Sequence, residues 1–141
     1  MNQDELVSAV RGASRIDTVE HTEAAVRATL AVLGERLSGG ETKDLASQLP
    51  PVFARVLPPT GRGERFGIEE FYRRVAEREG TEREGTEQEG RGCDQAHARQ
   101  HARAVVAALK ASISPGEFED VAGQLPNDYA DLLGREPIIH Y

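Results

Sequence analysis

Apolar residues recur along this chain at the spacing of amphipathic helices, and one such pattern occurs twice. Residues 18–37 carry an apolar stripe formed by Val26, Leu30, Leu33 and Leu37. Residues 95–113 carry the same stripe 76 positions later, formed by Ala102, Val106, Leu109 and Ile113. Either stripe would be exposed to water if its half of the chain stood alone. We therefore expect two long helices that pack together in one shared core.

The twenty residues that follow each stripe are also alike. Residues 38–57 read SGGETKDLASQLPPVFARVL and residues 114–133 read SPGEFEDVAGQLPNDYADLL, so that 10 of the 20 aligned positions are identical. The Leu-Pro pair in each stretch predicts that one helix ends there and that another starts with proline in its first turn. The similarity indicates a duplicated structural unit.

Helix caps recur at equivalent positions in the two stretches. Ser38 precedes Glu41 by three positions, and Ser114 precedes Glu117 by three. This is the spacing of a capping box, in which the serine accepts from a backbone N–H and the glutamate accepts from the serine N–H. We expect both serines to begin short helices in this way.

These patterns predict an all-α fold, with two three-helix repeats related by a pseudo-two-fold axis and packed into one helical bundle. The single domain, 1–141, divides into repeat one (1–58), a linker (59–66), repeat two (67–135) and an apolar C-terminal tail (136–141). Repeat two holds extra residues in the segment 80–92, GTEREGTEQEGRG, which lacks apolar side chains. We expect Gly80 to end a helix and this segment to be a flexible, solvated loop.

The run LGERLSGGETKDLASQLP and its repeat ISPGEFEDVAGQLP resemble the uncharacterised-domain family numbered 2267. The resemblance covers nearly the whole chain. It implies an all-helical, duplicated domain, and it favours a high-salt origin because the family occurs in bacteria and in salt-loving archaea. It implies no activity. The loop 80–92 is a departure from the shorter connections that the resemblance would imply.

Composition excludes several classes of partner. The net charge is −7, which argues against nucleic acid and against an anionic membrane surface, since both attract basic proteins. Only Lys43 and Lys110 of the 17 basic residues are lysines. An acidic chain poor in lysine fits a halophilic protein, whose self-repulsion is screened by salt, and it equally fits a GC-rich genome.

The chain carries no sign of export or of membrane insertion. Its first residues, MNQDELVSAV, are too acidic and polar for a signal peptide. Apolar runs are too short for a transmembrane helix. Cys93 is the only cysteine, so an internal disulfide is excluded and a reducing compartment is favoured. We expect a cytoplasmic protein.

One group of residues has the spacing of metal ligands. Cys93, His97 and His101 are four positions apart and would share a helix face. Two side chains at i and i+4 can bind one zinc, nickel or copper ion, but Cys93 and His101 would lie about 12 Å apart along the helix axis. Another ligand must then complete the shell: His21, His140 or a second chain. The alternative is that these histidines are ordinary residues at the edge of the core.

The other polar residues favour structural roles. Asp44 and Gln48 recur as Asp120 and Gln124, but no nucleophile accompanies them. We expect the glutamines to satisfy backbone groups freed by the proline breaks. An ion-pair face with interleaved glutamates is expected from Arg62, Arg65, Arg73, Arg74 and Arg78. Phosphate-binding loops and nucleophile elbows are missing from the sequence, so we expect neither enzyme activity nor a cofactor.

Two functions remain open. The first is a non-catalytic helical module for protein interaction or self-association, as a homodimer or with a protein partner, in which the apolar tail 136–141 docks on its own chain or on the partner. The second is a metal- or small-ligand-binding protein that uses the helix face of Cys93, His97 and His101.

Overall fold

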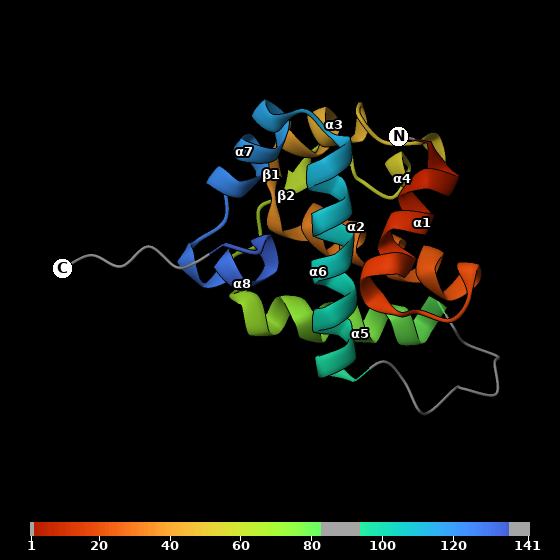
Figure 1. The fold of residues 1–141 in the computed structure, drawn as a ribbon. Coiled ribbons are helices and arrows are strands. Elements are labelled where there is room, and N and C mark those ends of the chain that lie inside the picture. The colour runs from red at the N-terminus through yellow and green to blue at the C-terminus, as the bar shows by residue number, and fades with distance from the viewer. Residues whose placement is uncertain (1, 83–93, 136–141) are drawn as a thin grey trace.

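Helices make up most of the structure, a computed structural model that describes residues 2–82 and 94–135 (Figure 1). The predicted all-α class is confirmed. In chain order the elements are α1 Gln3–Ser14, α2 Val19–Arg36, β1 Ser38–Gly39, α3 Glu41–Ala46, α4 Pro51–Ala54, β2 Gly61–Arg62, α5 Ile68–Glu82, α6 Gln95–Ser112, α7 Pro115–Gly123, a 3-10 turn Asn127–Tyr129 and α8 Ala130–Leu133. None of the helices in these described segments is long and apolar enough to cross a membrane.

The two long helices, α2 and α6, form the centre of the fold. Each begins at a side-chain cap: Thr18 accepts from the N–H of His21 at 3.0 Å, and Asp94 accepts from that of His97 at 2.8 Å. The helices contact each other, and both predicted apolar stripes are buried in one core. The prediction of a core shared by both halves is confirmed.

The shorter helices cover this centre by crossing between the halves of the chain. Helix α1 packs mainly on α6, and α5 packs on α2 as well as on α6. Helices α3 and α7 contact each other at the end of the molecule where α2 and α6 finish (Figure 1). Neither half therefore buries its own first helix alone.

Two boundaries differ from those expected. Within the predicted linker 59–66, β2 pairs antiparallel with β1, with Gly61 opposite Gly39. Gly61 permits this because a Cβ there would lie 2.2 Å from the Leu37 carbonyl oxygen. The expected helix end at Gly80 is wrong, because α5 continues to Glu82 and a helical glycine costs only about 1 kcal/mol. The rest of the predicted loop and the tail 136–141 lie outside the described residues.

The predicted capping boxes are also corrected. Ser114 caps α7 by accepting from the Glu117 N–H at 3.2 Å, but Ser38 lies in β1, and α3 has no side-chain cap. In neither place does the glutamate side chain accept a hydrogen bond from the serine N–H. The Ser114 N–H donates to the Gln48 side chain at 2.7 Å, and the Ser38 N–H donates to the Gln124 side chain at 2.8 Å. Each glutamine thus bonds to the opposite half of the chain, instead of to the backbone groups freed at the Leu-Pro pair beside it.

Candidate metal centre

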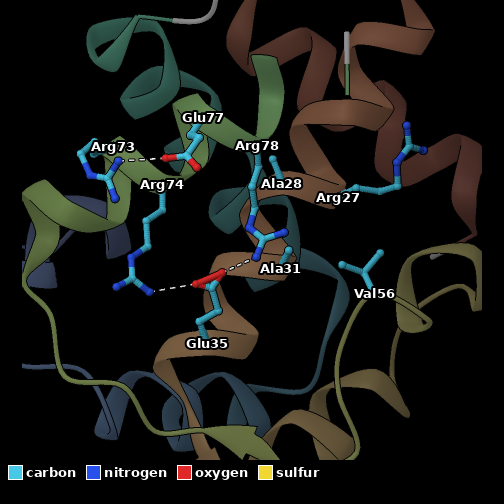
Figure 2. Close-up of a pocket in the computed structure, with 9 residues that line it drawn as sticks. All are labelled: Arg27, Ala28, Ala31, Glu35, Val56, Arg73, Arg74, Glu77 and Arg78. Carbon is cyan, nitrogen blue, oxygen red and sulfur yellow. Dashed lines mark hydrogen bonds and ion pairs between the residues drawn. The ribbon is translucent and has the colours of Figure 1, made fainter. Parts of the chain in front are cut away.

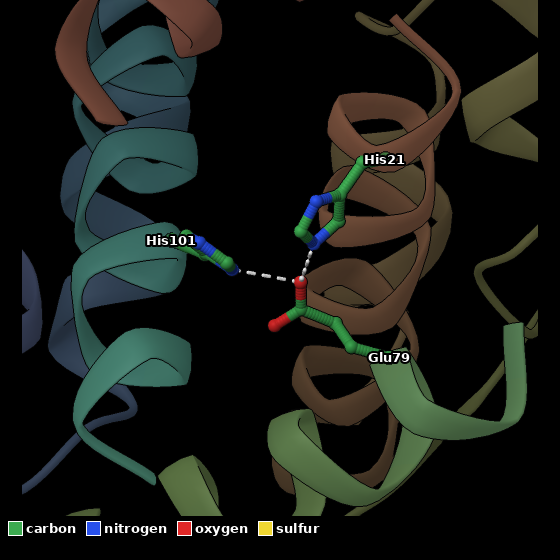
Figure 3. Close-up of side chains that lie close together, drawn as sticks. All are labelled: His21, Glu79 and His101. Carbon is green, nitrogen blue, oxygen red and sulfur yellow. Dashed lines mark hydrogen bonds and ion pairs between the residues drawn. The ribbon is translucent and has the colours of Figure 1, made fainter. Parts of the chain in front are cut away.

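Three side chains from three helices converge where α2 and α6 begin (Figure 3). His21 lies in the first turn of α2, and His101 lies in the second turn of α6. Glu79 comes from near the end of α5, which packs against both long helices. The Thr18 cap fixes where α2 starts, and so fixes the turn that carries His21.

The donor atoms of this cluster lie close together. His101 Nδ1 is 2.8 Å from Glu79 Oε1, and His21 Nε2 is 3.6 Å from the same oxygen. The imidazole rings meet edge to face, with centroids 5.3 Å apart. One ligand atom from each of the three residues lies within 4.8 Å of the other two. Both imidazole nitrogens therefore lie next to the same carboxylate oxygen, Glu79 Oε1.

Burial gives the cluster its chemical character. The Glu79 side chain is fully buried and His101 is nearly so, whereas His21 is 20% exposed. A carboxylate removed from water is stabilised by hydrogen-bond donors or by positive charge, and both an imidazole N–H and a metal ion are suitable partners. Two imidazole nitrogens and one carboxylate oxygen form a donor set found in zinc centres that leave a fourth position open. His21 is the member of the cluster most exposed to solvent.

The cluster contains only part of the set proposed from sequence. His101 belongs to it, and so does His21, which was expected as a completing ligand. His97 does not: its side chain is 64% exposed, and its Nδ1 lies 2.9 Å from Asp94 Oδ1. The His97 backbone N–H donates to that carboxylate and lowers the pKa of Asp94. Cys93 and His140 lie outside the described residues.

Glu79 was missed by the sequence reasoning, although the sequence does carry a signal for it. Phe71 and Val75 are buried on the inner face of α5, and Glu79 continues their i, i+4, i+8 stripe. A charged residue on an otherwise apolar stripe must find a partner in the core. That expectation would have marked Glu79 as a buried residue in need of a partner, but it would not have identified the partner.

A second feature lies between α2 and α5. A cavity of about 550 Å³ is lined by four arginines, Arg27, Arg73, Arg74 and Arg78, with Glu35, Glu77, Ala28, Ala31 and Val56 (Figure 2). Glu35 accepts from Arg74 Nη1 at 2.9 Å and also pairs with Arg78. Arg73 and Arg74 both donate to Glu70 and lower its pKa to about 2. The expected ion pairs are therefore present at Arg73, Arg74 and Arg78, which line the cavity, and also at Arg62, whose Nε lies 3.2 Å from Glu64 Oε2.

Fold and cluster together define an all-helical domain that gathers two histidines and a buried glutamate between three helices. The chain belongs to the family DUF2267, described as an uncharacterized conserved protein, which matches residues 3–132. The resemblance noted from the repeated motif is thus confirmed. No curated protein matches the chain.

Proposed function

We propose that this chain is a non-catalytic helical binding module whose ligand is a divalent transition-metal ion, zinc by its donor set, held by His21, Glu79 and His101. The observation that carries the proposal is the fully buried Glu79 carboxylate with an imidazole nitrogen on each side of one oxygen. A bound ion would add positive charge beside this buried carboxylate.

Distances in the cluster support this assignment. Zinc bonds of 2.0–2.1 Å in a tetrahedral arrangement place ligand atoms about 3.3 Å apart. The observed separations of 2.8 Å and 3.6 Å from Glu79 Oε1 lie on either side of that value. Small rotations of the side chains would therefore accommodate an ion. Because the ligands come from α2, α5 and α6, the ion would fasten three helices and stabilise the fold.

The proposal includes a duplicated architecture with pseudo-two-fold symmetry. Three observations support it. The two halves have a similar succession of helices. Gln48 and Gln124 make equivalent bonds to Ser114 and Ser38. The first helix of each half packs on the long helix of the other. In such a module the metal site would join the two repeats.

Titration of Zn²⁺, Ni²⁺ and Cu²⁺ into metal-free protein tests the site. We expect one equivalent of Zn²⁺ to bind with micromolar or tighter affinity by calorimetry, and to appear in the native mass spectrum. Loss of a ligand should weaken binding by about 10- to 100-fold or more in His101→Ala. The matched control is His97→Ala on the same helix, which should bind like the wild type. Loss of binding in His97→Ala but not in His101→Ala would move the site to the face of Cys93 and His97.

A second candidate, protein interaction or self-association, is favoured by the arginine-lined cavity. Among the described residues, Val19 is the large apolar side chain that is exposed, at 43%. A partner docking on the described surface would therefore be recognised by charge, and an acidic segment would fit Arg27 and Arg78. Sedimentation at about 0.1 M and 1 M KCl tests this, since charge-mediated association weakens as salt screens it. Salt-independent monomers, with wild-type behaviour in Arg27→Glu/Arg78→Glu, would eliminate self-association through the cavity.

A further inference from the structure

Three carboxylates meet at the other end of the long helices, where α3 contacts α7. Glu41 begins α3, and Glu117 and Asp120 lie on α7. One oxygen from each of the three lies within 4.8 Å of the other two. Glu117 is 7% exposed, so this group is only partly open to solvent.

The cross-links between the halves explain why these glutamates face each other. A capping glutamate normally turns back to the N–H of its serine. Here the N–H of Ser114 is already taken by Gln48, and that of Ser38 by Gln124. Glu41 and Glu117 therefore do not cap these serines, and their carboxylates lie close together where α3 contacts α7.

Their oxygens are left without donors. Glu41 Oε1 and Glu117 Oε2 are buried and have no hydrogen-bond partner among the described residues. Two buried acceptors at this range cannot satisfy each other while both groups are ionised. Burial and the neighbouring Glu41 carboxyl raise the pKa of Glu117 to about 8, and Asp44 and Asp120 add to the effect. The site must therefore take up a positive charge, from a proton or from a metal ion.

We propose that Glu41, Glu117 and Asp120 bind a hard divalent cation, with Ca²⁺ preferred over Mg²⁺. All the donors are carboxylate oxygens, the ligands that hard cations take. Ca²⁺ accepts irregular shells with bonds of about 2.3–2.6 Å, and oxygens within 4.8 Å of one another fit around it. Mg²⁺ takes shorter bonds of about 2.0–2.1 Å in a near-octahedral shell, so the three oxygens would have to draw closer together than Ca²⁺ requires. Exposed Asp120 leaves room for water to complete the Ca²⁺ shell.

This site is separate from the His21–Glu79–His101 cluster in place and in chemistry. It lacks nitrogen donors, so it would discriminate against the softer metals that imidazole prefers. A cation held here would link α3 to α7 and so join the two halves beside the glutamine cross-links.

Calorimetry with CaCl₂ on the metal-free full chain tests the site, in about 1 M KCl to screen weak surface binding. We expect one equivalent to bind with a dissociation constant of about 1 mM or lower. Glu117→Gln should bind at least about tenfold more weakly, because one ligand is lost. It should still fold, since a glutamine amide can donate to Glu41.

The control is Glu119→Gln, an exposed position on α7 whose carboxylate pairs with Arg135, outside the cluster. It should bind Ca²⁺ like the wild type, and so should His101→Ala, which separates this site from the zinc proposal. Absence of saturable Ca²⁺ binding, or equal binding by Glu117→Gln and the wild type, would overturn the proposal and leave a shared proton as the charge between Glu41 and Glu117.

Discussion

The two ends of the long helix pair show opposite solutions to the same electrostatic problem. Where α2 and α6 begin, a buried carboxylate, Glu79, lies between two imidazoles that can carry its compensating charge. Where they finish, Glu41 and Glu117 face each other with buried oxygens that lack donors. In the first cluster the imidazole nitrogens already contact the carboxylate, whereas in the second cluster two buried oxygens have no donor among the described residues. One scaffold thus offers a nitrogen-rich site and an all-oxygen site.

The separation of these ends makes the comparison testable. An 18-residue helix such as α2 spans about 27 Å, so the clusters do not share side chains. Substitutions at distant sites without common partners have nearly additive effects on stability. Changes at one end should therefore leave ligand binding at the other end unaltered, unless they disturb the core between them.

The largest expected effect is a loss of stability from substitutions in the core that lies between the two clusters. Leu33 and Leu109 lie on the buried stripes of α2 and α6. Leu33→Ala or Leu109→Ala should lower the free energy of unfolding by about 2–5 kcal/mol, because each leaves a cavity in the shared core. Chemical denaturation measures this, with Val19→Ala on the exposed face as the control. Losses below about 0.5 kcal/mol at both leucines would show that the halves do not depend on this core.

The next effect is a pH dependence of folding stability that comes from the carboxylate cluster. Burial beside Glu41 raises the pKa of Glu117 from 4.5 to about 8. Between these values the folded chain holds a proton that the unfolded chain releases. Stability should therefore fall as pH rises through this window, by up to about 1.4 kcal/mol per pH unit, and level off above pH 8.

Denaturation in EDTA, at pH values across that window, measures this dependence. Glu117→Gln supplies the comparison, since it removes the titrating group but leaves Glu41, Asp44 and Asp120, which face it. The histidine cluster is unchanged in the variant, so its contribution to stability cancels in the difference. A wild-type curve parallel to that of the variant would mean that Glu117 is ionised throughout.

Much of the fold could be predicted because its signals are local. The stripes of Leu33 and Leu109 and the Leu-Pro breaks are visible within a few turns of helix, and both stripes are buried as expected. The capping glutamates could not be assigned correctly, because Gln48 and Gln124 compete for the same N–H groups across 66 and 86 positions of sequence. Competition of that kind depends on how α3 and α7 meet in space.

The candidate metal site was likewise predicted in part, where its signal is local to one helix, and missed where it depends on packing between helices. Spacing along one helix suggested His97 and His101, but the His97 side chain is exposed, and its Nδ1 lies 2.9 Å from the carboxylate of the cap residue Asp94. The ligands that join His101 come from α2 and α5. Their convergence follows from helix packing, which residue spacing in a single segment does not specify.

A smaller effect tests the link between the halves. Gln48→Ala removes the bonds to the Ser114 N–H and hydroxyl, and Gln124→Ala removes those to the Ser38 N–H and carbonyl. Each should cost at least about 0.5–1.5 kcal/mol, the usual range for a single hydrogen bond. We expect each loss also to weaken Ca²⁺ binding, because the freed N–H would draw a glutamate back to its cap. Zn²⁺ binding at the far end should stay unchanged, and a loss there would contradict the independence of the two ends.

The smallest effect concerns salt. The net charge of −7 opposes the compact state, and screening removes part of that repulsion. The melting temperature in EDTA should therefore rise by a few degrees between about 0.1 M and 2 M KCl.

Salting-out strengthens apolar burial equally in any variant, so it cannot by itself identify the charged groups involved. Glu117→Gln separates the two contributions at a pH above 8, where the wild type has the extra negative charge. The wild type should gain more from salt than the variant, whereas His101→Ala should gain as much as the wild type. An equal rise in all three would assign the salt effect to apolar burial and to dispersed surface charge, and a flat response would argue against a high-salt origin.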